Sequence, residues 1–399
     1  MTSTTAELPQ TQPIILYYWG SFMARSNGSH SRMAGLTRYL SSNFERVILY
    51  SYMNHPEEPW TEDHQDAFRT HYPDIELVLD RLSFTARIAI KSKETLGSLF
   101  PGAARSILSV PNFNAAPNLE ALLKRERDPI FLLNYVDGLY QLPKADLDRT
   151  IVETHDVKYI KRRVKEVESV FSLKEILRFR SEFGALGAAN GIVAITANEA
   201  YLFRTMLKSA NVFHIPDYSP APPVDASANT EPTYDLLFVG SGNPLNEAGL
   251  LEFLQSFGHR LSGYSIAICG QICNSPRIRS AASALNHVEL VGFVEDLGEI
   301  FEKAKASFSP VDGTGLKIKI VDALRYGKPV FASRHSMDGL PDGFQDAVLP
   351  LTEEAFSTIL NDPSALSKAT QAARAYYLRL VNAGDLGTFS EYLSGLQDA

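Results

Sequence analysis

Residues 312–322, DGTGLKIKIVD, combine residue types that can bind a phosphate-bearing ligand. The residues that carry this chemistry are Gly313, Thr314, Gly315, Lys317, Lys319 and Asp322. The glycines precede a helical pattern, and the start of a helix offers unpaired amides and a dipole that favours negative charge. The two lysines add full positive charge, and Asp322 can accept hydrogen bonds from hydroxyl groups. We therefore expect a nucleoside-diphosphate site here.

The charge balance of the chain makes these lysines more informative. The sequence has a net charge of −8, which argues against a nucleic-acid-binding protein. Residues 1–224 carry 25 basic and 25 acidic residues, whereas residues 225–399 carry 13 and 21. The positive charge near residue 317 is thus a local feature of an acidic half. Two cysteines, Cys269 and Cys273, form no disulfide framework and indicate a reducing compartment.

Other polar residues follow predicted strands. His155, in the run Thr154-His155-Asp156, comes directly after one strand, and Asn27-Gly28 lies between another strand and a helix. The alternative for His155 is an ordinary polar residue at a strand end. The alternative for Asn27-Gly28 is a solvent-exposed turn. Gly240-Ser241-Gly242 also follows a strand, but Leu245 replaces the third glycine of a dinucleotide-binding motif. We expect those glycines to allow the backbone to approach a diphosphate.

Asp146-Leu147-Asp148 has the spacing of an Asp-x-Asp metal motif. It precedes a predicted strand, whereas a metal-binding pair of this kind would have to follow one. We therefore interpret it as a solvated turn and expect no metal and no cofactor.

The elements that must position these residues alternate between strand and helix, which is typical of an α/β fold with parallel sheets. Expected strands of the first half are 14–18, 47–52, 130–134, 150–153, 192–196 and 212–215. Expected strands of the second half are 236–239, 265–269, 288–291, 307–310, 329–332 and 347–350. Helical patterns are clearest at 29–42 and 158–188.

Residues 217–233 hold four prolines and indicate a linker. We expect a first Rossmann-like domain over 1–216, a second over 234–365, and C-terminal helices over 366–399 that cross back to the first domain. We expect the two domains to face each other across a cleft. A ligand would bind there, because ligands of open α/β sheets bind at the carboxyl ends of the strands.

The run GTGLKIKIVDALRYGKPV resembles the donor-site signature of family-4-type glycosyltransferases (glycosyl transferases group 1), which have the GT-B fold. LLFVGSGNPLNEAGLLEFL (236–254) and VELVGFVEDLGEIFEKAKASFSPV (288–311) are similar to other parts of that domain. The first domain is more divergent, although IVETHDV (151–157) and GIVAITANEAYLF (192–203) resemble its last strands.

The resemblance implies a donor site with the following residues. Gly313, Thr314, Gly315 and Leu316 would lie against the sugar and diphosphate, with Asn27, Gly28, Gly240 and Ser241 nearby. Lys317 and Lys319 would neutralise the diphosphate, and Phe293 and Val294 would line the base pocket. The catalytic group would be His155, Lys319 and Asp322. Asp322 stands where the family has a ribose-binding glutamate. Many members have two glutamates separated by seven residues, whereas Asp312 and Asp322 are separated by nine. Contact between Asp312 and the sugar therefore stays open.

The implied activity is a retaining, metal-independent transfer of a sugar from a nucleotide sugar to a glycan or lipid-linked acceptor. The setting would be polysaccharide or glycoconjugate synthesis in the cytoplasm. A nucleotide-sugar epimerase of the same fold and a non-catalytic nucleotide-sugar-binding partner remain alternatives. Basic residues crowd 81–127 and 158–180; they form either solvated helix faces or a surface that contacts the inner face of the membrane.

Overall fold

Short apolar runs form the strands of two parallel sheets, each covered by helices. The computed structural model describes residues 12–25, 27–110, 116–142, 146–163, 172–207, 210–222, 232–294, 296–313 and 315–398. Thr314 and most of the expected linker lie outside this set. The expected α/β fold with two Rossmann-like domains is confirmed by sheets of seven and six strands.

The first sheet has the strand order β3-β2-β1-β4-β5-β6-β7, and every neighbouring pair is parallel. Its strands are β1 (Ile14–Tyr17), β2 (Val47–Tyr52), β3 (Glu76–Asp80), β4 (Ile130–Asn134), β5 (Thr150–Glu153), β6 (Gly191–Ala194) and β7 (Asn211–His214). The order reverses between β1 and β4. Loops that follow these two strands diverge there and leave a crevice at the carboxyl edge of the sheet.

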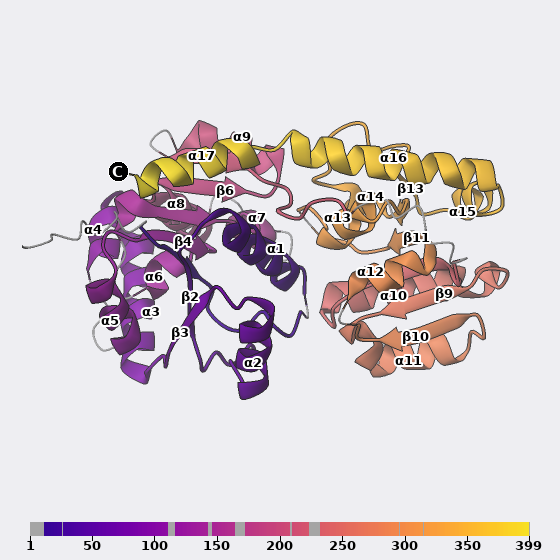
Figure 1. Cartoon of the computed structure of the whole chain (residues 1–399). Helices are drawn as coiled ribbons and strands as arrows, with labels where there is room; N and C mark the ends of the chain where they lie inside the picture. The colour runs from indigo at the N-terminus through magenta and orange to yellow at the C-terminus, as the bar shows by residue number, and fades with distance from the viewer. Residues whose placement is uncertain are drawn as a thin grey trace, which may run out of the picture.

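Helices cover both faces of this sheet (Figure 1). One face packs against α1 (Gly28–Asn43), α2 (Glu62–His71) and α17 (Leu386–Gln397). The other packs against α3 (Phe84–Leu99), α4 (Ala104–Ser109), α5 (Pro117–Arg125), α6 (Gly138–Gln141), α8 (Leu173–Leu186) and α9 (Ala197–Met206). Shorter pieces are η1 (Pro101–Ala103), η2 (Leu147–Arg149) and α7 (Lys158–Arg163).

The second sheet has the order β10-β9-β8-β11-β12-β13, so its reversal falls between β8 and β11. Its strands are β8 (Tyr234–Val239), β9 (Ile266–Cys269), β10 (Val288–Gly292), β11 (Ala304–Ser309), β12 (Val330–Ala332) and β13 (Val348–Pro350). Its helices are α10 (Pro244–Phe257), η3 (Gly258–Leu261), η4 (Gln271–Asn274), α11 (Pro276–Ser283), α12 (Leu297–Glu302), α13 (Ile318–Arg325), α14 (Arg334–Met337) and α15 (Glu353–Leu360).

The last two helices connect the two halves of the molecule. α16 (Pro363–Asn382) buries Tyr376 and Tyr377 in the core of the second domain, whereas α17 buries Phe389 and Leu393 in the core of the first. Figure 1 shows α16 and α17 running across the top of both domains. The chain therefore passes twice between the domains, once before β8 and once between α16 and α17.

The strand β3 is absent from the sequence-based prediction. It lies at the edge of the first sheet, and four of its five residues are only partly buried. Its sequence, ELVLD, mixes charged and apolar residues within a short run, so it lacks the continuous apolar character of β1, β2 and β4. An edge strand with one solvated side gives too weak a pattern to predict.

Candidate nucleotide-sugar site

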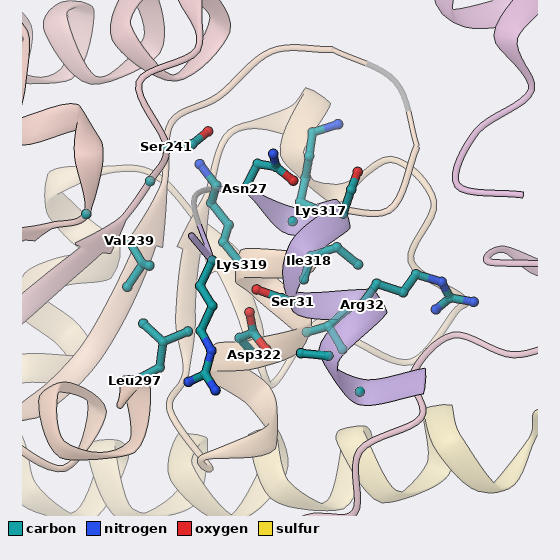
Figure 2. A pocket seen from close by; sticks show the side chains of 18 of the residues that line it. Asn27, Ser31, Arg32, Val239, Ser241, Leu297, Lys317, Ile318, Lys319 and Asp322 are labelled. Carbon is teal, nitrogen blue, oxygen red and sulfur yellow. The ribbon is translucent and has the colours of Figure 1, made fainter. Parts of the chain in front are cut away.

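A cavity of about 860 Å³ lies between the two domains and is lined by residues of both (Figure 2). The first domain contributes the start of α1 and the loop after β5. The second contributes the loops after β8 and β9, the segment before α12, and the loop between β11 and α13. All of these segments lie at the carboxyl edges of the sheets, where ligands bind in open α/β folds.

The loop between β11 and α13 requires glycine at two positions. Gly313 has φ +115° and Gly315 has φ +76°, a region that side chains with a Cβ adopt with difficulty. Lys317 stands at the N-cap of α13, and its ammonium group donates to the carbonyl groups of Gly313 (2.9 Å) and Gly315 (3.1 Å). Lys317 thus holds the loop in a curved conformation and brings positive charge to the start of the helix.

Lys319 extends from the first turn of α13 into the cavity (Figure 2). Its Nζ donates to Oδ1 of Asn246 at 2.6 Å and lies 4.5 Å from the ring centre of Phe238. Burial lowers the pKa of Lys319 to about 7, and the nearby charge of Lys317 contributes. An ammonium group that has lost much of its hydration gains more from an anion than a solvated one does.

Asn246 links this lysine to the loop after β8. Asn243 caps α10 by accepting a hydrogen bond from the Asn246 backbone, while the Asn246 side-chain nitrogen donates to the Ser241 carbonyl at 3.0 Å. Gly240 packs so closely on Gly270 that a Cβ on Gly270 would lie 2.3 Å from the Gly240 carbonyl oxygen. The loops after β8 and β9 are therefore packed closely together at the cavity, next to the Asn246 side chain that holds Lys319.

Asp322 is buried on the next turn of α13, near Arg325 and Asp217. Its carboxylate lies 3.5 Å from the guanidinium of Arg325. Burial raises the pKa of Asp322 to about 6; Arg325 opposes this shift and Asp217 adds to it. Asp217 accepts a hydrogen bond from the hydroxyl of Tyr377 at 2.8 Å. A ligand hydroxyl that reaches Asp322 would meet a carboxylate with few competing donors.

The start of α1 forms the facing wall. Asn27 caps α1 by accepting from the backbone of His30 at 3.0 Å. Glu58 holds this turn through His30 (2.8 Å) and the indole of Trp19 (2.7 Å), and these hydrogen bonds outweigh the effect of burial and lower the pKa of Glu58. Gly28 touches the second domain, because a Cβ there would lie 3.1 Å from Cγ1 of Ile318.

His155 lies in the turn after β5 and faces the same cavity. Its ring is buried and stacks on Tyr135, with centroids 4.3 Å apart and planes at 17°. Tyr135 has a positive φ of 65°, and its hydroxyl lies 2.6 Å from Oγ of Ser29 on α1. Asp156 reaches the opposite domain, since a Cβ on Gly315 would lie 2.9 Å from its Oδ1.

Two carboxylates hold this turn from behind. Glu199 of α9 accepts from the backbone of Val157 at 3.1 Å, and Glu182 of α8 accepts from Lys158 and Tyr159, both at 2.7 Å. Burial raises the pKa of Glu199 to about 7. Consecutive amides at the start of α7 are therefore bonded to side chains, which keeps His155 and Asp156 at the cavity.

Comparisons with known proteins agree with this geometry. Residues 233–373 match the model of the family glycosyl transferases group 1. A search of curated proteins found no significant match.

Solved structures match over nearly the whole chain. Sucrose-phosphate synthase from Thermosynechococcus elongatus has a TM-score of 0.64 at 15% identity, covering 97% of this chain and 100% of that one. A point mutant of TarM from S. aureus has a TM-score of 0.65 at 9% identity, covering 97% of this chain and 100% of that one. HepE from Anabaena has a TM-score of 0.57 at 12% identity, covering 96% of this chain and 98% of that one. At such identities the likeness establishes the GT-B fold.

The second domain is therefore similar to the glycosyl transferases group 1 family, and the whole chain has the GT-B fold. Together these findings support a glycosyltransferase.

The structure of the glycosyltransferase brings most of the predicted site residues together. Those that line the cavity are Asn27, Gly28, His155, Gly240, Ser241, Phe293, Val294, Gly313, Leu316, Lys317, Lys319 and Asp322. Gly315 does not line it and lies against Asp156 instead. Thr314 lies outside the described residues. Asp312 lines the cavity and is exposed. The individual roles of these residues stay predictions.

Sequence reasoning missed Asn246, Glu58, Glu182 and Glu199. Each acts through a partner far away in sequence, such as Lys319 for Asn246, 73 residues on. Only Glu199 leaves a local signal, the capping box with Thr196 at the start of α9. That signal predicts a helix start but not its bond to Val157.

The Asp-x-Asp run of the glycosyltransferase lies before β5, at the opposite edge of the sheet from the cavity. Asp146 accepts from the backbone of Asp148 at 3.0 Å, and Asp148 pairs with Arg105 at 2.5 Å. Within the described residues, no group of three His, Cys, Asp or Glu side chains is arranged to hold a metal ion.

Proposed function

We propose that the chain transfers a sugar from a nucleoside-diphosphate sugar to a glycan or lipid-linked acceptor, with retention at the anomeric carbon and without a metal ion or bound cofactor. The observation that carries the proposal is Lys319, a partly desolvated ammonium group beside Lys317 at the start of α13, in a cavity between two Rossmann-like domains. Neighbouring folds support the donor class, because TarM was solved with UDP and HepE with UDP-glucose.

Lys319 and Lys317 would stabilise the negative charge that develops on the departing diphosphate. Positioned donors can each contribute about 3 kcal/mol to such a transition state. This assignment gives the protein its own source of positive charge at the leaving group. In a retaining transfer of this kind the leaving phosphate takes the proton of the acceptor hydroxyl, so no side chain is assigned as general base.

The other residues would bind and orient the donor. Asp322 would accept hydrogen bonds from the ribose hydroxyls, and Phe293 and Val294 would contact the base. His155 would contact the donor sugar from the first domain, opposite the donor loop. The contacts of Gly28 with Ile318 and of Gly315 with Asp156 would exclude water when the ligand is enclosed, and this limits hydrolysis of the donor.

The experiment begins with a thermal-shift screen of nucleotide sugars, because a ligand at about 100 times its dissociation constant adds about 2.7 kcal/mol of stability. Turnover of the best donor is then followed by release of nucleoside diphosphate, and the anomeric configuration of the product by NMR. An inverted product would refute retention. Isomerised donor without an acceptor would indicate an epimerase, and tight binding without turnover under any acceptor would indicate a binding partner.

A further inference from the structure

Large apolar side chains lie exposed on one group of helices in the first domain. Phe84 is 77% exposed and Leu173 is 72% exposed. Among the described residues of α3, η1, α4, α7, α8 and their flanks, the exposed large apolar side chains are Phe84, Ile88, Leu96, Leu99, Phe100, Val110, Ile160, Leu173 and Ile176. A concentration of exposed apolar side chains on adjoining helices marks an interaction surface. We refer to these residues as the α3–α8 surface.

The helices that carry this surface pack against one another. α8 contacts η1, which follows α3, because a Cβ on Gly184 would lie 2.9 Å from the carbonyl oxygen of Pro101. The ammonium group of Lys93 on α3 donates to the carbonyl of Val110, which follows α4. α3 faces the core of the domain through Ala86 and Ile90.

α3 is apolar on two sides. The spacing of Phe84, Ile88 and Leu99 places them together on its outer side, because positions four and fifteen residues apart fall on nearly the same face of a helix. All three are more than half exposed. The inner side is the ordinary core contact of a covering helix, so the outer side calls for a second, separate partner.

Positive charge surrounds these apolar residues. Arg81, Arg87, Lys174 and Arg180 are exposed on or beside the same helices. Two further basic residues are paired, Lys91 with Glu94 and Arg105 with Asp148. Of the acidic residues of α8, Glu175 is buried beside Arg178 and Glu182 bonds the start of α7. The surface thus combines apolar and basic groups within a chain whose net charge is −8.

The position of the surface relates it to the cavity. α3 follows β3 and α8 precedes β6, so both helices begin near the carboxyl edge of the first sheet. Phe84 and Leu173 stand at these helix starts, on the same edge as His155 and the cavity. Figure 1 shows α3 and α4 in the part of the first domain that lies away from the second domain.

We propose that the α3–α8 surface binds the surface of an anionic lipid bilayer, with Phe84, Leu173 and their apolar neighbours inserted among the acyl chains and the basic residues at the phosphate groups. Apolar insertion and attraction to anionic lipid act together in peripheral proteins, and each basic residue near the bilayer adds roughly a fivefold gain in binding. Among the described helices, none has the length and apolar character needed to cross a bilayer.

This surface covers only part of the basic ranges 81–127 and 158–180 that the sequence offered for membrane contact. Lys93 is buried, and Arg125 on α5 forms ion pairs with Glu76 and Glu126. Those residues give little net attraction to lipid. The surface depends instead on the exposed apolar side chains, for which residue composition gave no signal.

The test measures co-sedimentation of the full chain with phosphatidylcholine vesicles, with and without phosphatidylglycerol. Wild type is expected to bind only the vesicles that contain phosphatidylglycerol, and to be released by salt. The double variant Phe84→Ser/Leu173→Ser is expected to bind at least about tenfold more weakly, because exposed Phe and Leu lose their burial in the bilayer. Arg87→Ser/Lys174→Ser is expected to lose the preference for anionic lipid.

Matched controls are Tyr201→Ser on α9 and Leu378→Ser on α16, which remove exposed apolar side chains outside this surface. Both should bind vesicles as wild type does, and thermal unfolding confirms that all variants are folded. No binding by wild type, or equal loss in the controls, overturns the proposal. So does a concentration-dependent dimer in sedimentation velocity that Phe84→Ser/Leu173→Ser abolishes, since the surface would then bind a second copy.

The donor site is tested separately by nucleoside-diphosphate affinity in the absence of vesicles. Vesicle binding with no nucleotide binding would refute the proposed transfer and leave the membrane surface intact. Nucleotide binding with no vesicle binding would refute the membrane surface and leave the proposed donor site intact.

Discussion

The Nζ of Lys319 lies 2.6 Å from Oδ1 of Asn246, which joins the helix after β11 to the helix after β8. These are the two strands between which the second sheet reverses its order. Asn246 is a neutral acceptor, so it orients the ammonium group without neutralising it. The lysine therefore keeps its charge available for a ligand at the point where the fold opens a crevice.

Replacement of Lys319 by alanine should weaken nucleoside-diphosphate binding by about ten- to a hundredfold, because hydrogen bonds to charged groups contribute roughly 1.5–3 kcal/mol. Isothermal titration calorimetry measures the change. Lys305→Ala is the matched control, since that lysine pairs with Asp235 at the start of β8, away from the cavity. Equal affinity in Lys319→Ala and wild type would refute the donor-site assignment.

The pH dependence of this affinity follows from two shifted groups. The pKa of Lys319 is lowered to about 7, so above pH 7 the free protein must take up a proton to bind an anion, and affinity should fall as pH rises. The pKa of Asp322 is raised to about 6, so below pH 6 the protonated carboxyl accepts fewer hydrogen bonds, and affinity should fall as pH decreases. We expect an affinity maximum between about pH 6 and 7.

Calorimetry at pH 8 in buffers of different ionisation enthalpy should detect the proton uptake. Lys319→Ala should remove the alkaline limb and Asp322→Asn the acidic limb. A flat profile in the wild type between pH 5 and 8 would contradict both assignments.

The sequence predicted strands such as β2 and β4 well, because each is a mostly apolar run that is buried along its whole length. It also predicted the donor loop, where glycines and lysines are adjacent in the chain. It could not predict that Glu58 anchors His30 or that Glu182 bonds the start of α7. Those contacts join segments 28 and 24 residues apart and depend on how the helices pack.

His155→Ala should lower turnover by more than it lowers nucleotide affinity, because His155 faces the cavity from the domain opposite the donor loop. Continuous assays of nucleoside-diphosphate release give the rate, and calorimetry gives the affinity. His259→Ala, on the exposed η3 of the second domain, is the control and should change neither. If His155→Ala also changes neither, the histidine serves only to pack against Tyr135.

Chelation should leave activity unchanged if the lysines supply the positive charge at the leaving group. Turnover is measured with and without EDTA after dialysis. Asp146→Asn and Asp148→Asn serve as a check, since both aspartates are engaged in the turn before β5. Activity that EDTA removes and Mg²⁺ restores would refute metal independence.

Closure of the cavity can be tested at Gly315, which lies against Asp156 of the other domain. Gly315→Ala introduces a Cβ at φ +76° and 2.9 Å from Oδ1 of Asp156, so it should cost stability through backbone strain and also displace the Asp156 carboxylate from this contact between the domains. Gly327→Ala, at the end of α13, is the matched control, because it has φ +69° but no atom closer than 3.9 Å to the added Cβ. Both variants should lose about 1 kcal/mol of unfolding free energy to strain, as measured in urea.

The two variants should differ in activity, because only the alanine at position 315 meets a side chain of the facing domain. Gly315→Ala should lower turnover and raise hydrolysis of the donor relative to transfer, since losing the contact with Asp156 lets water reach the donor. Gly327→Ala should leave both quantities at the wild-type level. Equal turnover in the two variants would show that the contact between Gly315 and Asp156 has no part in enclosing the donor.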